Sequence, residues 1–275
     1  MSSTPARDFG QRRFVILLPS ALARAGLCLG LWWIRVLGMK SAEFAFSAGL
    51  IDLLPRHRRR SPITIRFSGP QTTKHLIESL GIPHTELGDV IVDGAVSSLH
   101  HIVQSGEVIE VLEVCSPPWG AEEPRFVLDG HLGRLNAGLR MLGLDCAYQG
   151  NCPDDELVER ALVEDRILLS RDRRLLMRKS VVNAHLVRSL DPQLQLESVI
   201  RRFGLGRWFR PFRRCIRCNQ QLARADKQSL TDRLLPLTRL YFDDFRICPS
   251  CGQLYWKGSH FKRLESLVAH LRSLS

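Results

Sequence analysis

The spacing of hydrophobic and polar residues divides the chain into parts that follow different rules. Residues 63–67 and 108–112 alternate between apolar and polar side chains, as half-buried strands do. Residues 125–128 and 166–169 are more continuously apolar, and the segments between them carry apolar residues at helical spacing. We therefore expect a β-rich part from about residue 41 to 115, followed by an α/β part from 124 to 200.

The β-rich part predicts strands at residues 42–48, 63–67, 90–92 and 108–112 and a helix at 73–80. Thr72 or Thr73 is the candidate N-cap of this helix, and Gly81 ends it. Asp93-Gly94 is typical of a hairpin turn. The order ββαββ resembles a β-grasp, ubiquitin-like fold, and most of all its sulfur-carrier branch. Carriers need a free C-terminal diglycine, but here the chain continues, so we expect this domain to bind a partner protein or a substrate.

In the α/β part, acidic residues follow the predicted strands. Strand 125–128 leads to Asp129 and then to a helix at 132–142, closed by Gly143. Asp154 and Asp155 open a second helix, and strand 166–169 leads to Asp172. A further strand at 185–188 precedes Asp191. Strands of an open α/β sheet present such carboxylates at their C-terminal edge.

Carboxylates that converge at one edge repel one another unless a cation neutralises them. Their hard oxygen ligands select Mg²⁺ or Mn²⁺, which can activate a water and stabilise both oxygens of a phosphodiester displacement. We therefore predict a catalytic metal site at Asp129, Asp155 and Asp172, with Asp154 as a substitute for Asp155. The alternative is that these acids only cap helices and solubilise loops.

Four cysteines near the C-terminus form two Cys-x-x-Cys pairs, Cys215/Cys218 and Cys248/Cys251, with 29 residues between them. Two such turns can close a tetrahedral four-thiolate zinc site. Gly252 after the second pair suits a turn that needs positive φ. The alternative is two disulfides or four unrelated thiols. The other four cysteines are scattered, which favours a reducing compartment and a cytoplasmic location.

The basic charge of the chain is concentrated in its last quarter. Residues 201–275 hold 16 Lys and Arg against five Asp and Glu, a net +11 that equals the net charge of the whole chain. Arginines meet phosphates and aromatic rings stack on unpaired bases, so we predict RNA contacts here. The alternative is that the aromatic rings pack this four-cysteine module onto the preceding α/β part and that the arginines are only solvated. The candidates are Arg207, Trp208, Arg210, Arg213 and Arg214.

The N-terminal 40 residues do not fit either domain. Residues 14–38 are strongly apolar, but Arg24 and Arg35 interrupt the run, and a central arginine opposes membrane insertion. Three interpretations remain open: an upstream extension with the true start at Met39, a peripheral helix, or a signal or anchor. We expect no stable membrane association.

Several motifs together resemble one known family. Asp129-x-x-Leu132-Gly133-Arg134-Leu135, Leu139–Asp145, Asp154-Asp155-Glu156-Leu157 and the run ending in Ser170-Arg171-Asp172 are similar to the RNase-like domain at the C-terminus of the Mut-seven exonuclease. The ending Cys248-Pro-x-Cys251-Gly252 with Tyr255-Trp256-x-Gly258-Ser259-His260 is also characteristic. That family joins a PIN-like nuclease domain to a four-cysteine zinc ribbon, and many bacterial members carry a ubiquitin-like domain in front.

The resemblance implies a three-layer PIN-like α/β domain and a metal-dependent ribonuclease. It gives Asp129, Asp155 and Asp172 the roles of the first-strand, helix-start and Ser-Arg-Asp acids, and places Arg134 and Arg140 in a basic helix that can meet phosphates or pair with the acids. A further acid usual in PIN nucleases has no clear counterpart here. The alternative function is a non-catalytic adaptor that binds RNA or tRNA through a degenerate PIN-like site.

Overall fold

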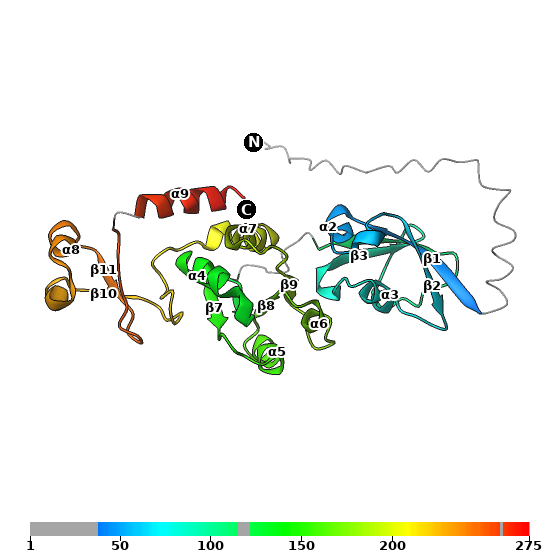
Figure 1. Ribbon diagram of the computed structural model, residues 1–275, viewed down its shortest axis with the longest axis horizontal. Helices are drawn as coiled ribbons and strands as arrows, with labels where there is room; N and C mark the ends of the chain where they lie inside the picture. Colours follow the sequence, from blue (N-terminus) through cyan, green and yellow to red (C-terminus); the bar gives the residue numbers. More distant parts are fainter. Residues whose placement is uncertain (1–37, 115–121, 259–260, 275) are drawn as a thin grey trace, which may run out of the picture.

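The computed structural model describes residues 38–114, 122–258 and 261–274. These residues form three parts arranged in a row: a β-sheet domain, a parallel α/β domain and a small C-terminal ribbon (Figure 1). The expected combination of a β-grasp domain, a three-layer α/β domain and a four-cysteine ribbon is confirmed. Of the predicted extension at residues 1–40, residues 1–37 lie outside the described residues, whereas Met39 and Lys40 belong to the first strand of the β-sheet domain. Among the described residues, no helix is long and apolar enough to cross a membrane.

The first domain is a five-stranded sheet in the order β2-β1-β5-β3-β4. The first and last strands pair in parallel, and every other pairing is antiparallel, which is the β-grasp arrangement. The alternating sequence of β2 gives strictly alternating burial, because successive side chains point to opposite faces. The strands are β1 (Met39–Phe46), β2 (Ile63–Ser68), β3 (Leu87–Val92), β4 (Ala95–Ser97) and β5 (Val108–Glu113).

The helix cap and the hairpin turn that the sequence predicts are present in this domain. Helix α3 (Thr73–Ser79) is capped by Thr72, whose Oγ1 accepts a hydrogen bond from His75 N. Asp93 and Gly94 both adopt positive φ and join β3 to β4. The predicted order ββαββ was incomplete, because the residues after this turn form the short strand β4. A four-residue helix, α2 (Ala48–Ile51), was also not predicted.

The second domain is a four-stranded parallel sheet in the order β7-β6-β8-β9. Alternate residues of its strands face opposite layers: Phe126 and Leu128 belong to one hydrophobic cluster and Val127 to the other. Helices α4 (Gly133–Met141) and α7 (Pro192–Phe203) cover the first face, and α5 (Asp154–Val163) and α6 (Arg173–Leu176) the second. The strands are β6 (Arg125–Leu128), β7 (Asp145–Tyr148), β8 (Ile167–Ser170) and β9 (Ala184–Leu186).

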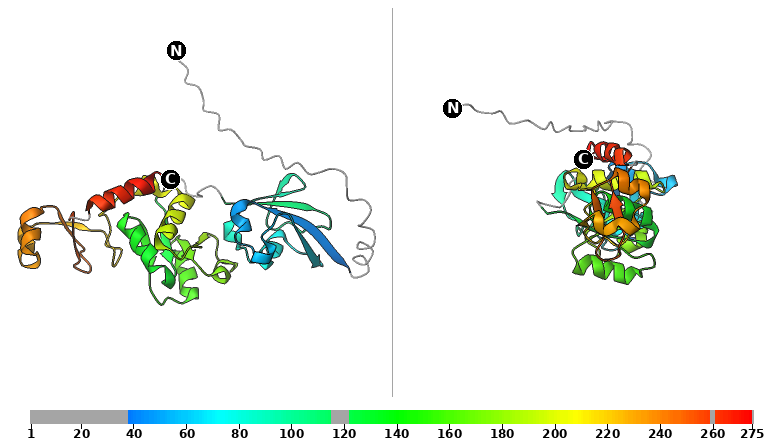
Figure 2. Two further views of the ribbon diagram at one scale, coloured as in Figure 1. Left: turned by 45° about the horizontal axis from the view of Figure 1, so that its top comes forward. Right: turned by 90° about the vertical axis from the view of Figure 1, so that its left-hand side faces the viewer.

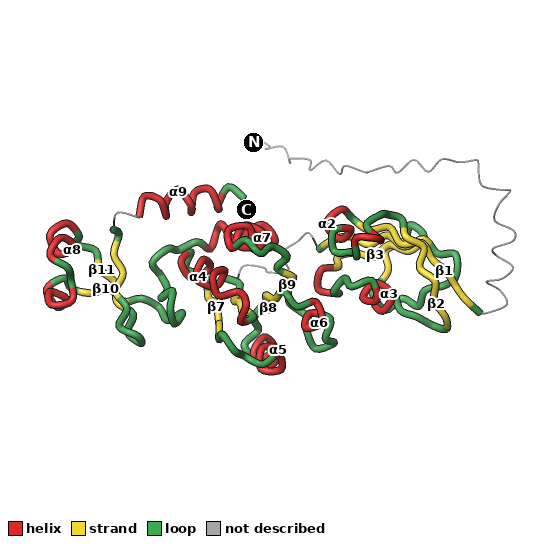
Figure 3. Tube along the Cα trace, viewed as in Figure 1, coloured by secondary structure: helices red, strands yellow, loops and turns green. Residues whose placement is uncertain are grey.

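The C-terminal ribbon is a three-stranded antiparallel sheet followed by one long helix. Its strands are β10 (Ala223–Ala225), β11 (Phe245–Ile247) and β12 (Leu254–Trp256). Helix α8 (Pro236–Tyr241) lies between the cysteine pairs (Figure 3). Helix α9 (Phe261–Arg272) returns to the α/β domain, and its Val268 and Leu271 join the cluster that holds α4 and α7 (Figure 2).

The β-grasp domain is fixed to the α/β domain by buried polar contacts. Glu86, 2% exposed, accepts a hydrogen bond from Leu186 N at 2.8 Å and lies 3.2 Å from His185 Nδ1. Arg173 donates to the carbonyl groups of Leu53 and Gly81. Residues of both domains form one hydrophobic cluster. The two domains therefore share a hydrophobic core.

Candidate active site and four-cysteine centre

The predicted acids Asp129 and Asp172 lie at the topological switch point of the parallel sheet. Strand β7 lies on one side of β6, and β8 lies on the other. The connection after β6 therefore runs toward one edge of the sheet, and the connection after β8 runs toward the opposite edge. Ligands of open α/β sheets bind in the crevice outside the carboxyl ends of strands at such a point. Asp129 follows β6, and Ser170 ends β8 directly beside it.

Ser170 joins the two acids. Its Oγ donates a hydrogen bond to Asp129 Oδ2 at 2.8 Å and accepts one from the backbone N–H of Asp172 at 2.9 Å. Ser170 is fully buried, so this bridge is held in a fixed position. Asp129 Oδ1 also accepts from His131 N, and Asp172 Oδ1 accepts from Arg174 N. Each acid therefore also caps the short helix that follows it, as the alternative interpretation of the sequence expected.

A close backbone approach shapes the loop at Asp129. A Cβ added to Gly130 would lie 2.0 Å from the carbonyl oxygen of Gly150, so only glycine fits without a shift of the backbone. The hydroxyl of Tyr148, at the end of β7, donates a hydrogen bond to Gly130 O. The turn after β6 and the loop after β7 are thus packed together at the same edge of the sheet.

The other two predicted acids have a different partner. Asp154 and Asp155 open α5, and both form ion pairs with Arg178, which follows α6. The Asp155 side chain is 94% exposed. In the parts of the chain that the structure describes, Asp129, Asp172 and these acids do not form a group of three with ligand atoms within metal-binding distance.

The four predicted zinc ligands do come together. The Sγ atoms of Cys215, Cys218, Cys248 and Cys251 all lie within 4.8 Å of one another. Cys215 Sγ is 3.5 Å from Cys251 Sγ, and Cys218 Sγ is 3.4 Å from Cys248 Sγ. These separations suit four thiolates around one ion with Zn–S distances near ~2.3 Å. They are far longer than an S–S bond of about 2.05 Å, and all four cysteines are free.

The two cysteine turns are near copies of each other. Asn219 N donates to Cys215 O and Gly252 N donates to Cys248 O, both at 2.9 Å. Asn219 and Gly252 each follow their cysteine pair and have φ of 69° and 70°. Positive φ at Gly252 confirms that prediction. Asparagine tolerates the same conformation in the first turn.

Among the four clustered cysteines, Cys215 has the surroundings that most favour the thiolate form. It is completely buried, which alone would raise its pKa, but the Tyr255 hydroxyl at 3.2 Å donates to its Sγ. Together with backbone N–H donors in the turn, this hydrogen bond lowers the pKa of Cys215 to about 6. Thiolates are the species that bind zinc, so the donor set fits a zinc ion.

The first cysteine turn is docked onto the α/β domain. Arg140 of α4, 4% exposed, donates to Cys146 O of the edge strand β7 and to the carbonyl oxygens of Ile216 and Arg217 in the turn. Asn219 donates from Nδ2 to Asp145 Oδ1 and accepts from Cys146 N. The ribbon is thus joined to the sheet edge by side chains that also shape its cysteine turn.

Comparison with known protein families assigns two parts of the chain. Residues 124–268 match the Mut7-C RNAse domain, and residues 39–117 match the Mut7-C ubiquitin domain. The chain belongs to the Mut7-C RNAse domain family. No curated protein and no solved structure matches it. The ubiquitin-like and RNase-like parts that the sequence motifs indicated are confirmed.

Asp145 is the ionic centre of the contact between the Mut7-C sheet and its ribbon. Burial alone would raise its pKa, but hydrogen bonds from Arg166 and Asn219 and the charges of Arg166 and Arg214 keep the pKa below its usual value. Arg166 Nη1 lies 2.7 Å from Asp145 Oδ1, and Arg214 Nη2 lies 2.9 Å from Oδ2. One carboxylate therefore holds the sheet edge, the ribbon turn and the segment leading into it.

We expect Asp145→Ala to destabilise the protein by about 3 kcal/mol, because it leaves two largely buried arginines without their partner. Urea unfolding of the full chain, compared with wild type, measures this change. Asp52→Ala, at an exposed position with ordinary helical backbone angles at the end of α2, is the control. An Asp145→Ala variant as stable as wild type would contradict the proposed role of this carboxylate.

The structure separates the predicted RNA-binding arginines of the Mut7-C domain into two groups. Arg140 is buried in hydrogen bonds to carbonyl groups, so the prediction that it meets phosphates is wrong. Arg213 pairs with Glu123 and Arg214 with Asp145, so both have structural partners. Arg134 and Arg210 are exposed. Arg207 is exposed and lies over the ring of Trp208, which packs partly against the core.

Sequence reasoning missed Ser170, Arg178 and Asn219 as residues of these sites. Ser170 was visible only as part of the Ser-Arg-Asp run, and its bridging role depends on β8 lying next to β6. Arg178 has no sequence pattern that links it to Asp154 and Asp155. Asn219 could have been found, because it stands in the first cysteine turn where Gly252 stands in the second.

Proposed function

We propose that this protein is a metal-dependent ribonuclease whose Mut7-C domain hydrolyses RNA phosphodiester bonds. One observation carries the proposal: Asp129 and Asp172 are joined through buried Ser170 at the switch point of a parallel sheet. Membership of the Mut7-C RNAse domain family supports it. The basic ribbon and the exposed Arg134, Arg207 and Arg210, with Trp208, would hold the RNA.

Asp129 and Asp172 would hold a Mg²⁺ or Mn²⁺ ion, because carboxylate oxygens are the ligands these ions prefer. A bound ion of this kind lowers the pKa of a water and neutralises charge at a phosphodiester. Ser170 fixes the orientation of Asp129, and the helix caps fix one oxygen of each carboxylate. We propose Asp155, or Asp154 in its place, as the third acid, with Arg178 balancing its charge when RNA is absent.

Zinc would have a structural role in the ribbon, and RNA would be the main partner. The β-grasp domain would offer its outer surface to a partner protein, since its other side is docked on the Mut7-C domain. We place the protein in the cytoplasm, because the six cysteines within the described ranges are free and thiolate zinc sites suit a reducing compartment.

A second candidate is a non-catalytic adaptor that binds RNA or tRNA. It is favoured by one observation: Asp154 and Asp155 pair with Arg178 instead of meeting Asp129 and Asp172. Such a protein would bind RNA with a steep dependence on salt, whatever divalent metal is present.

The test is to incubate the purified full-length chain with mixed labelled RNAs and Mn²⁺, beside the Asp129→Asn/Asp172→Asn double variant. We expect cleavage by wild type alone, with RNA binding retained by both. Equal cleavage by both proteins would locate the activity elsewhere or in a contaminant. Absence of cleavage with any divalent metal, together with salt-sensitive binding, would favour the adaptor.

A further inference from the structure

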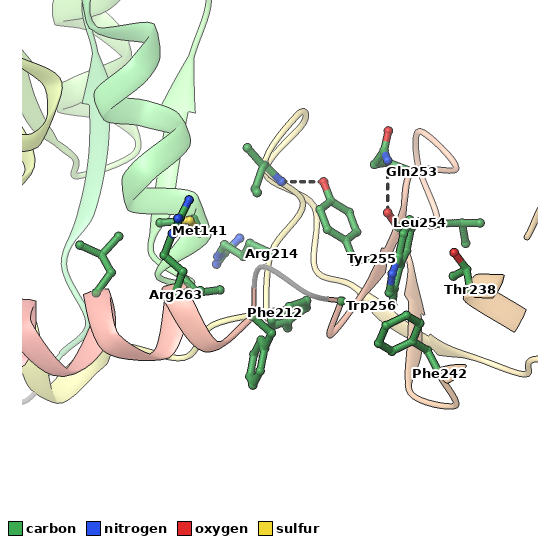
Figure 4. Close-up of a pocket in the computed structure, with 15 residues that line it drawn as sticks. Met141, Phe212, Arg214, Thr238, Phe242, Gln253, Leu254, Tyr255, Trp256 and Arg263 are labelled. Atoms are coloured by element: carbon green, nitrogen blue, oxygen red, sulfur yellow. Dashed lines mark hydrogen bonds between the residues drawn. The ribbon is translucent and has the colours of Figure 1, made fainter. Parts of the chain in front are cut away.

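A large apolar groove separates the ribbon from the Mut7-C sheet domain. It has a volume of about 1100 Å³ and lies between the ribbon strands and helix α9 (Figure 4). Met141, at the end of α4, lines it from the sheet domain, and Leu264 and Leu267 line it from α9. The groove contains none of the proposed acids and is distinct from the site at Asp129.

Five of the fifteen lining residues are aromatic. Trp256 is 36% exposed, and Figure 4 shows its ring beside that of Phe242. The Phe212 and Phe261 rings form a second pair with centroids 5.6 Å apart. Tyr255 is the exception, because its hydroxyl is bound to Cys215 and to Ile216 N. The groove therefore has aromatic ring faces that core packing does not fully cover.

The charged residues that line the groove are basic. Arg214 and Arg263 line it, and no lining residue is acidic. Arg214 is held in place by Asp145, and Arg263 is exposed on α9. Lys257, beside the groove, lies over the Phe261 ring at 5.3 Å and pairs with Asp244 at 3.6 Å. A ligand that fits this surface has flat apolar faces and carries negative charge.

We propose that this groove binds unpaired bases of single-stranded RNA, with its arginines meeting the phosphates between them. Base stacking on aromatic side chains and arginine contacts to phosphate are the usual basis of single-strand binding. Duplex RNA keeps its bases stacked inside the helix and cannot offer their faces. The groove would then give the proposed ribonuclease its substrate class, single-stranded RNA. The proposal rests on the proposed function only in the experiments that measure cleavage, and not in those that measure binding.

The groove and the acids lie at opposite ends of α4. Asp129 lies four residues before this helix and Met141 is the last of its nine residues, so the helix between the two sites is roughly 13 Å long. An RNA strand anchored in the groove must cross this distance to reach Ser170 and its acids. Long single strands should therefore gain from the groove, and oligonucleotides too short to span it should not.

The matched variants are Phe242→Ala/Trp256→Ala in the groove and Leu237→Ala/Tyr241→Ala outside it. Leu237 and Tyr241 are exposed apolar residues on α8 that do not line the groove. Binding of a fluorescein-labelled 20-nucleotide oligo(A) and of a hairpin of equal length is measured by anisotropy in the full chain, in the Asp129→Asn/Asp172→Asn background. Zinc content and melting temperature establish that each variant is folded.

We expect the groove variant to bind oligo(A) about 10- to 100-fold more weakly, from the loss of stacking on two rings, and the hairpin and the control variant to change less than about twofold. Equal weakening for oligo(A) and hairpin, or unchanged binding of oligo(A), would overturn the proposal. So would tight binding of an acidic amphipathic peptide that oligo(A) cannot displace. If the groove variant does not fold, crosslinking of wild type to 4-thiouridine RNA decides: crosslinks that miss Phe212, Phe242 and Trp256 would contradict the site.

Cleavage distinguishes this inference from the proposed function. With active-site acids intact, the groove variant should lose cleavage of long single strands but retain cleavage of short ones. Loss of the proposed function would appear as no cleavage by wild type, while oligo(A) binding still depends on Phe242 and Trp256. Failure of the groove alone would appear as wild-type cleavage that the groove variant retains on RNA of every length.

Discussion

The Asp129→Asn variant is expected to cleave RNA at least about a hundredfold more slowly than wild type. Substitution of an outer-shell partner of a metal ligand commonly costs 10- to 100-fold, and a direct ligand should cost more. The change removes a negative charge from the proposed metal site while it keeps the size of the side chain. Cleavage rates of a single-stranded RNA, measured over a titration of Mn²⁺, test the prediction.

Asparagine is chosen because Asp129 also has a structural task. Its Oδ1 caps a short helix by accepting from His131 N, and an asparagine oxygen can accept the same hydrogen bond. Asp191→Asn is the matched control, since Asp191 caps α7 in the same way through Gln193 N and Leu194 N. Asp191→Asn should melt like wild type, and Asp129→Asn somewhat lower, because its Nδ2 replaces the oxygen that accepts from buried Ser170. Only Asp129→Asn should lose activity.

A graded response would locate the centre more closely. Ser170→Ala removes a hydrogen bond to Asp129 but leaves both carboxylates, so its rate should fall between those of wild type and Asp129→Asn. If Asp129→Asn cleaves as fast as wild type, the carboxylates are helix caps only. The proposed metal site would then have to be abandoned.

Local features of the fold were predictable from the sequence because each depends on near neighbours along the chain. The alternation at residues 63–67 dictates the face of β2, Asp93-Gly94 dictates the hairpin, and the spacing of the cysteines dictates the four-sulfur cluster. Strand β7 was missed because its four residues, Asp-Cys-Ala-Tyr, lack the apolar run that marks the equally short β6 and β8. Helix α7 was missed although Asp191-Pro192 begins it with a cap and a proline at its first turn.

Contacts between distant segments could not be predicted in the same way. Arg140 looks like any basic residue of an amphipathic helix, yet its guanidinium is bound to carbonyl groups 76 and 77 residues away. Asp154 and Asp155 are acids at a helix start, and only the position of Arg178 shows that they are paired. The sequence could indicate which residue types carry the chemistry, but their partners depend on the order of the strands.

The Cys215→Ser variant is expected to lose zinc and the fold of the ribbon. The ribbon sheet consists of three strands of three residues each, so it has little core of its own. Structural zinc sites supply on the order of 10–16 kcal/mol in small metal-dependent modules at neutral pH, which a core of this size cannot replace. Loss of the first turn also removes the carbonyl acceptors of Arg140. The α/β sheet keeps its own two hydrophobic layers, so we expect the loss to be confined to the C-terminal part.

Metal analysis and limited proteolysis measure this effect on the full-length protein. Wild type should carry one zinc per chain and resist trypsin between residues 212 and 258, whereas Cys215→Ser should carry much less zinc and be cut there. Cys152→Ser, which replaces a half-buried cysteine outside the cluster, should behave as wild type. A wild-type protein without zinc and without titratable thiols at these four positions would instead mean disulfides. A Cys215→Ser protein that keeps its zinc and its protease resistance would show that the ion is held elsewhere, because three thiolates and a serine hydroxyl form a much weaker zinc site.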